Sequence, residues 1–184
     1  MKPTHVTNTQ HLIRDNVAFL RQGIALLRAL SDERYCQARP PLYESNVGAH
    51  FRHVYDHYRQ LLDGLGAGQV DYDQRQRDPH MAADRSVAIT RLTALIADLE
   101  RLASDPPSSP LGVRLSSSAS SREEEIETPS TLARELQFLV SHTVHHYALI
   151  AFILRSEGLE IPRGFGVSPS TLEYQDGQAR HAAC

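Results

Sequence analysis

Histidine is the residue type in this chain best placed to do chemistry. Most of the ten histidines fall into two short stretches: His50, His53 and His57, and then His142, His145 and His146. Both stretches are predicted to be helical, and residues three or four apart share one face of a helix. Imidazole is the commonest protein ligand for transition-metal ions. Two such helices facing each other could hold a divalent ion through three ring nitrogens.

Apolar residues at steps of three and four form a stripe along one face of each predicted helix. The position of a histidine relative to this stripe indicates whether it points into the protein. His146 lies on the stripe of its helix, and His142 lies one turn earlier and rotated by about 40°, so the two can converge on one point. His145 lies about 100° away from His146 and is expected to face solvent or a neighbouring helix. In the other cluster each histidine comes one residue before an apolar residue, so any of the three could turn inward. The alternative is that all of them are hydrogen-bonded core or boundary residues.

Three neutral histidines would leave coordination positions open on a bound ion. Open positions are typical of catalytic metal sites, whereas structural sites are usually closed by four ligands, often cysteines. Neither Cys36 nor Cys184 is placed to close such a site. Asp56 could accept a ring N–H as an outer partner of a ligand, or it could be a solvated acid on a helix surface.

Composition excludes several classes of function. The chain has 184 residues, of which 41% are hydrophobic and 22% are charged, as in an ordinary soluble domain. The formal net charge of -3 offers no electrostatic attraction for nucleic acid or an anionic membrane. The apolar runs are too short and too polar to span a bilayer, and the N-terminus lacks the apolar core of a signal peptide. We therefore expect a cytoplasmic protein without nucleic-acid or membrane partners.

Helical periodicity predicts the elements that must position the histidines. Four segments show apolar residues at steps of three and four: 8–30, 45–65, 84–102 and 129–156. Four amphipathic helices in one domain predict an all-α four-helix bundle. The connection over 66–83 is long enough to return along a helix of about 30 Å, so the second and third helices are expected to run parallel.

The remaining segments are expected to contain no fifth helix. Residues 112–115 and 125–127 could pair as a small hairpin, and 161–174 is predicted to be an ordered coil because of its prolines and glycines. The predicted organisation is a single bundle domain over 1–173, followed by a C-terminal tail over 174–184. In the long connection, Arg75 and Arg77 could clamp a carboxylate, although a solvated linker with internal ion pairs is the favoured interpretation.

Two motifs resemble those of the DinB-like (DinB/YfiT-type) superfamily of metalloenzymes. One has the form small-Gly-x-x-x-x-His-apolar, and it is seen here from Gly48 to His53 and Val54. The other is His-x-x-x-His on the last helix, matched by His142 and His146. The resemblance covers most of the chain. It implies an up-down-down-up bundle and a metal triad of His53, His142 and His146.

The resemblance also implies a range of activities. Some relatives look like transferases or isomerases that use a low-molecular-weight thiol. We therefore expect an enzyme that depends on a divalent metal (zinc, nickel or iron) and acts on a small molecule, as a hydrolase or a thiol-dependent transferase. His50 and His57 are additional to the family pattern, so either could replace or join His53, or act as a proton shuttle beside the metal. The alternatives are a non-catalytic metal or small-ligand binding protein and a structural dimerisation module. A homodimer is expected in each case.

Overall fold

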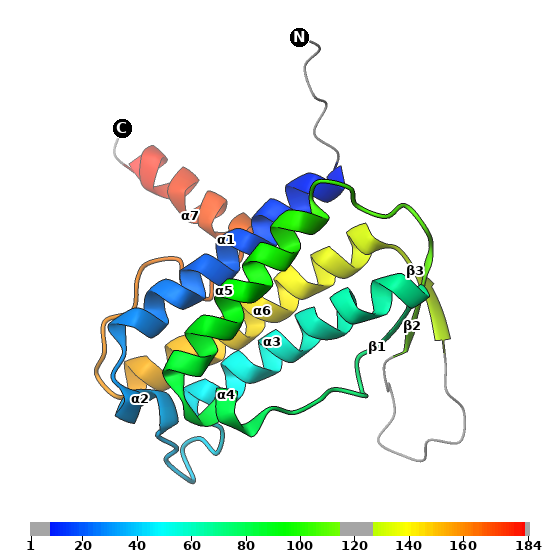
Figure 1. The fold of residues 1–184 in the computed structure, drawn as a ribbon. Coiled ribbons are helices and arrows are strands. Elements are labelled where there is room, and N and C mark those ends of the chain that lie inside the picture. The colour runs from blue at the N-terminus through cyan, green and yellow to red at the C-terminus, as the bar shows by residue number, and fades with distance from the viewer. Residues whose placement is uncertain (1–7, 115–126, 183–184) are drawn as a thin grey trace.

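Four long helices form the body of the molecule. The computed structural model describes residues 8–114 and 127–182 (Figure 1). The bundle helices are α1 (Asn8–Ala29), α3 (Val47–Gly64), α5 (Arg85–Leu102) and α6 (Leu132–Ser156). Helices α1 and α6 run one way and α3 and α5 run the other, so the topology is up-down-down-up. The predicted all-α bundle with parallel second and third helices is confirmed.

The apolar stripes read from the sequence form the core of this bundle. All five stripe residues of α1 are buried: Ile13, Val17, Leu20, Ile24 and Leu27. The stripe of α6 is buried over its whole length, with His146 among its apolar members. Steps of three and four keep these side chains on one side of each helix. By length and composition α6 could cross a membrane, but the same is true of a core helix, and its stripe packs here against α1 and α3.

Side-chain caps mark where the bundle helices begin. Asn46 accepts a hydrogen bond from the backbone N–H of Ala49 and caps α3, and Asp84 caps α5. The cap of α6 is Thr131. The sequence predicted a start at Pro129, which is wrong. Pro129 lies in a strand that pairs with a neighbouring strand, and this pairing competes with helix formation.

A three-stranded sheet covers one end of the bundle. It consists of β1 (Gln69–Asp71), β2 (Leu111–Arg114) and β3 (Glu127–Ser130) in the order β1-β2-β3. The antiparallel pairing of β2 with β3 confirms the expected hairpin, of which residues 115 and 125–126 lie outside the described part of the chain. Strand β1 was not expected, because three residues are too few to show a pattern. Its parallel pairing with β2 ties the start of the long connection to the sheet.

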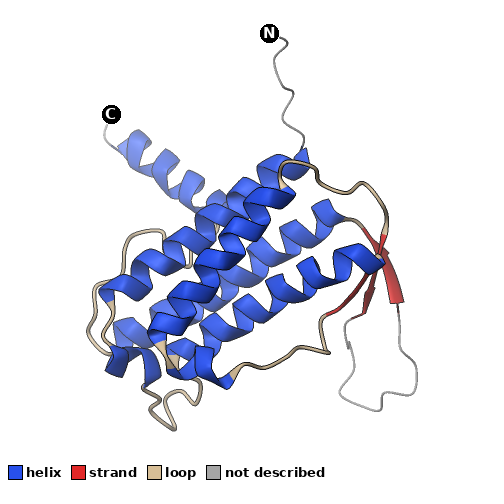
Figure 2. Cartoon of the chain, in the orientation of Figure 1, coloured by secondary structure: helices blue, strands red, loops and turns tan. Residues whose placement is uncertain are grey.

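Shorter elements complete the chain. They are α2 (Asp32–Cys36), a 3-10 turn (Leu65–Ala67), α4 (Pro79–Ala83) and α7 (Pro169–Ala182). The expectation of coil up to residue 174 and of no fifth helix is wrong, since α7 begins at Pro169, and proline is well suited to the first turn of a helix. Figure 2 shows α7 extending away from the bundle. The proposed division at 173/174 between domain and tail stays a prediction.

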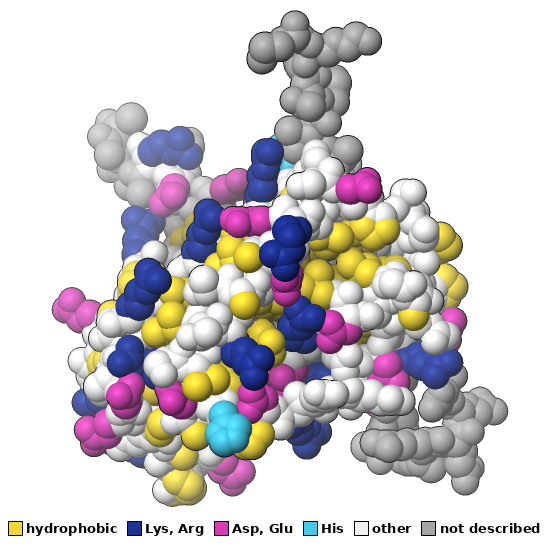
Figure 3. Space-filling model, in the orientation of Figure 1, with side chains coloured by type: hydrophobic (Ala, Val, Ile, Leu, Met, Phe, Trp, Pro, Cys, Tyr) yellow, Lys and Arg dark blue, Asp and Glu magenta, His cyan; other side chains and the backbone are white. Residues whose placement is uncertain are grey.

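The face over α1 and α5 carries charges of both signs. Basic and acidic side chains lie side by side on this face in Figure 3. Ion pairs such as Arg21 with Glu100 and Arg59 with Asp98 cross between neighbouring helices there. Ion pairs at or near the surface contribute little to stability, typically about 0–1 kcal/mol each.

Candidate metal centre

The two histidine clusters meet between α3 and α6. His53 lies close to both predicted partners, with ring centroids 5.0 Å from His142 and 4.6 Å from His146. The rings of His142 and His146 are also 4.6 Å apart. His145 is exposed on the outer side of α6, as its position on the helix predicted. The structure therefore brings together the three residues that the sequence put forward as ligands.

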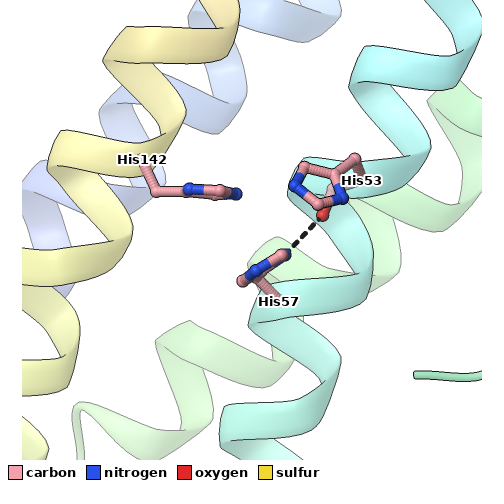
Figure 4. A group of neighbouring side chains, drawn as sticks. All are labelled: His53, His57 and His142. Atoms are coloured by element: carbon pink, nitrogen blue, oxygen red, sulfur yellow. Dashed lines mark hydrogen bonds between the residues drawn. The ribbon is translucent and has the colours of Figure 1, made fainter. Parts of the chain in front are cut away.

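His57 joins the same cluster. Its ring centroid is 4.4 Å from that of His53 and 4.1 Å from that of His142. One ring nitrogen from each of His53, His57 and His142 lies within 4.8 Å of the others, close enough together to hold a metal ion. Figure 4 shows His142 reaching across from α6 toward the two histidines of α3. The cluster thus offers two possible triads that share His53 and His142, and the ligand set with His146 stays a prediction.

The hydrogen bonds of His57 decide its tautomer. Its Nδ1 lies 2.9 Å from the backbone carbonyl oxygen of His53, and a carbonyl can only accept, so Nδ1 carries the proton. In the neutral ring Nε2 is then an acceptor, and it lies 3.0 Å from Nη1 of Arg75, which can only donate. Both nitrogens of His57 therefore already have partners.

His142 is in the opposite situation. Its Nε2 is buried and has no hydrogen-bond partner among the described residues. Leaving a buried polar atom unpaired costs about 1–3 kcal/mol, so such atoms are rare in folded proteins. A metal ion at this nitrogen would remove the deficit. The donor set fits such an ion, because clustered imidazoles are suitable ligands for zinc, nickel or iron.

His50 pairs with His146 at the other side of the cluster. Their Nδ1 atoms are 3.0 Å apart, so one of the two nitrogens donates a proton to the other. If His146 is the donor, its Nε2 keeps a lone pair available for a metal ion. Hydrogen bonds of this kind commonly fix the tautomer of a ligating histidine.

Burial keeps the cluster neutral. It lowers the pKa of both His53 and His142 to about 3, and the neighbouring histidines and Arg75 act in the same direction. Burial also lowers the pKa of His57 to about 4, although its hydrogen bond to the carbonyl of His53 opposes the shift. The pKa of His146 is lowered as well, for the same reason. Near neutral pH all four rings are uncharged, which is the form that binds a metal.

The structure gives Asp56 neither of the two roles predicted for it. It is only 3% exposed, so it is not a solvated surface acid. Its carboxylate accepts a hydrogen bond from Arg52, at 3.3 Å, rather than from a histidine ring. Burial raises the pKa of Asp56 to about 6 even though Arg52 opposes the shift.

A buried polar network behind the histidines was missed from the sequence. Asn16 of α1 donates to the carbonyl oxygen of Leu136 in α6, at 3.1 Å, and accepts from the hydroxyl of Tyr58 in α3, at 2.7 Å. Tyr58 also lies 3.2 Å from the hydroxyl of Thr143, next to His142 in the chain. These bonds join three helices and hold α3 and α6 in fixed register. A polar residue three positions after Ile13, on the inward face of α1, was the available signal.

Comparison with known proteins identifies the family of this chain. A family model for the DinB superfamily matches residues 21–150. The chain belongs to the DinB superfamily. The part of this DinB-superfamily chain that matches includes both histidine clusters and ends within α6. The predicted family membership is confirmed.

One curated relative is similar over part of its length. It is "FK506-binding protein 5" of Rhizopus delemar, 31% identical over 105 residues. The match covers 57% of this DinB-superfamily chain but only 27% of that protein, so the similarity concerns a segment of a larger molecule. No solved structure matches the chain.

Proposed function

We propose that this protein is a divalent-metal-dependent enzyme of the hydrolase or thiol-dependent transferase type, with His53, His142 and His146 as the metal ligands. The observation that carries the proposal is the buried Nε2 of His142, which has no hydrogen-bond partner among the described residues. That nitrogen belongs to a ring within 5.0 Å of the ring of His53 and within 4.6 Å of the ring of His146. Zinc, nickel and iron all suit this donor set.

The choice of His146 over His57 follows from hydrogen bonding. The two nitrogens of His57 are used by the carbonyl of His53 and by Arg75. The hydrogen bond that the structure gives His146 is at Nδ1, which leaves its Nε2 for the metal. His50 would then accept the Nδ1 proton of His146 and keep that ring in the ligating tautomer.

A bound divalent ion would supply a Lewis acid with coordination positions open to a small substrate. The chain's own contribution is to orient the ligands and to exchange protons beside them. His50 holds a proton shared with His146, so it is proposed to move protons during the reaction. His57, the other residue expected to do so, is proposed to orient Arg75 instead, because both of its nitrogens have partners. We further propose a cytoplasmic homodimer that acts on a small molecule, which for the transferase type would include a low-molecular-weight thiol.

Elemental analysis of protein purified without a histidine tag tests the metal proposal. We expect near-stoichiometric metal in the wild type and its loss in His53→Ala and His146→Ala. His145→Ala is the matched control, because His145 is an exposed neighbour on the same helix, and it should keep its metal. Circular dichroism confirms that each variant is folded.

A comparison of His57→Ala with His146→Ala tests the ligand set. Loss of metal in the His57 variant and its retention in the His146 variant would replace His146 by His57 as the third ligand. If the wild type takes up no zinc, nickel or iron, the metal proposal is wrong. Metal-loaded protein that turns over neither ester nor thiol-transfer substrates, yet binds them, would show a binding protein instead of an enzyme.

A further inference from the structure

Arg75 is a cation beside the histidine cluster whose hydrogen bond goes to an uncharged group. It follows β1 in the long connection, is half-buried, and donates from Nη1 to Nε2 of His57 at 3.0 Å. Within residues 8–114 and 127–182, no carboxylate lies within ion-pair distance of its guanidinium. The buried acid closest to the cluster in sequence, Asp56, is paired with Arg52. Burial disfavours the charge of Arg75 and lowers its pKa, whereas Asp56 and Asp73 favour the charge from longer range. A carboxylate at hydrogen-bond distance is what the described surroundings of Arg75 lack.

The backbone leading to Arg75 is held in place. The hydroxyl of Tyr72, which is fully buried, donates to the carboxylate of Glu135 in α6 at 2.9 Å. The carboxylate of Asp71 accepts from the backbone N–H groups of the two residues that follow Tyr72, at 2.9 and 3.2 Å. Gln60 of α3 donates to the carbonyl oxygen of Gln74. The linker is therefore attached to both helices that carry the histidines.

His57 orients the guanidinium. Because its own Nδ1 proton is committed to the carbonyl of His53, its Nε2 accepts a single N–H from Arg75. A guanidinium has five N–H donors in a planar fork, so the others remain for a ligand. Such a fork matches the two oxygens of a carboxylate, and charge-assisted bonds of this type are stronger than neutral ones.

We propose that Arg75 binds a carboxylate group of the substrate, so that the substrates of this protein are small carboxylic acids whose reacting group lies at the histidine cluster. The placement of the reacting group at the histidine cluster rests on the proposed function. Charge supports it, because a divalent ion held by neutral histidines and a guanidinium beside them would both attract an anion. His57 is a positioning residue in this account, since it acts on the substrate through Arg75.

Arg77 provides the matched control. It lies two residues further along the same connection, carries the same charge and is exposed. Arg77→Gln therefore removes an equal charge from the linker without removing a group that touches the cluster. Arg75→Lys keeps the charge and loses the planar fork, so it separates simple attraction from two-point recognition.

The test is a binding titration in which a carboxylate is compared with its neutral amide. Succinate and succinamide, and then benzoate and benzamide, are titrated into the metal-loaded protein and followed by calorimetry and ligand-observed NMR. We expect the wild type to prefer each acid over its amide. Arg75→Gln should weaken acid binding by about tenfold or more, as expected for lost charge-assisted hydrogen bonds. Arg75→Lys should lie between the two, and Arg77→Gln should match the wild type.

The proposal is overturned if Arg75→Gln binds the acids as tightly as the wild type, or if the wild type shows no preference for either acid over its amide. Metal content measured on the same samples separates this result from the proposed function. A variant that keeps its metal and its affinity for the acids refutes the role of Arg75 alone. If no form of the protein binds metal, the same titration without metal still reports on Arg75, and only the assignment of the reacting group is lost.

Discussion

Gly48 permits the close approach of two helices next to the histidine cluster, so Gly48→Ala is a demanding test of the packing. A methyl group at this position would lie 2.1 Å from the backbone carbonyl oxygen of Ala82 in α4 and 2.8 Å from Cε1 of Tyr35. Contacts this short cannot persist. A backbone carbonyl cannot rotate away as a flexible side chain can, so α4 must shift relative to α3.

The cost follows from two opposing terms. Forcing an extra methyl group into a packed interior typically destabilises a protein by about 1–3 kcal/mol. Replacing glycine by alanine inside a helix returns at most about 1 kcal/mol, and less near a helix start such as this one. The net expectation is a loss of about 2 kcal/mol. For a chain of this size, that corresponds to a fall of about 4–8 °C in melting temperature.

Thermal and urea unfolding followed by circular dichroism measure this loss. Gly66→Ala is the matched control, because a methyl group at Gly66 would meet nothing within 4 Å, and its effect should stay within about 0.5 kcal/mol. Equal unfolding midpoints for the two variants would refute the reasoning, since they would show that α3 and α4 do not approach as closely as the structure indicates.

Three further predictions concern buried polar groups. Asn16→Ala should cost about 2–3 kcal/mol in urea unfolding, since Tyr58 loses its acceptor; a cost near zero would contradict the network. Tyr72→Phe should cost about 1–3 kcal/mol and speed hydrogen exchange in the linker, because Glu135 loses a buried donor; unchanged exchange would refute the anchoring role. In metal-free protein, the pKa values of the clustered histidines are lower in the folded state than the value of about 6.5 that histidine has in the unfolded chain. Below about pH 6.5 the unfolded chain therefore binds more protons than the folded protein does. Stability should therefore fall between about pH 6.5 and pH 3, by at most about 1.4 kcal/mol per pH unit for each histidine, with the raised pKa of Asp56 opposing part of the loss. Calorimetric unfolding at a series of pH values measures this slope, and a flat profile would show that the histidines are not held neutral.

Local sequence was sufficient to predict the four long helices and the faces that they bury. Apolar spacing determines which side of a helix turns inward, whatever packs against it, and capping residues such as Asn46 and Asp84 act within a single turn. For the same reason the burial of His146 on the stripe of α6 and the exposure of His145 could be predicted. Both depend only on rotation about one helix axis.

Tertiary structure alone decided which hydrogen-bond partners the site residues have. The sequence could not show that His57 has both nitrogens engaged, because one partner, Arg75, comes from a linker whose path depends on the sheet and on Tyr72. Strand β1 forms only because β2 is available to pair with it. The same holds for Nε2 of His142, which depends on neighbouring elements for a partner and has none in the part of the chain that the structure describes. Spacing along a chain predicts direction, but the distance between two elements is determined by how all of them pack.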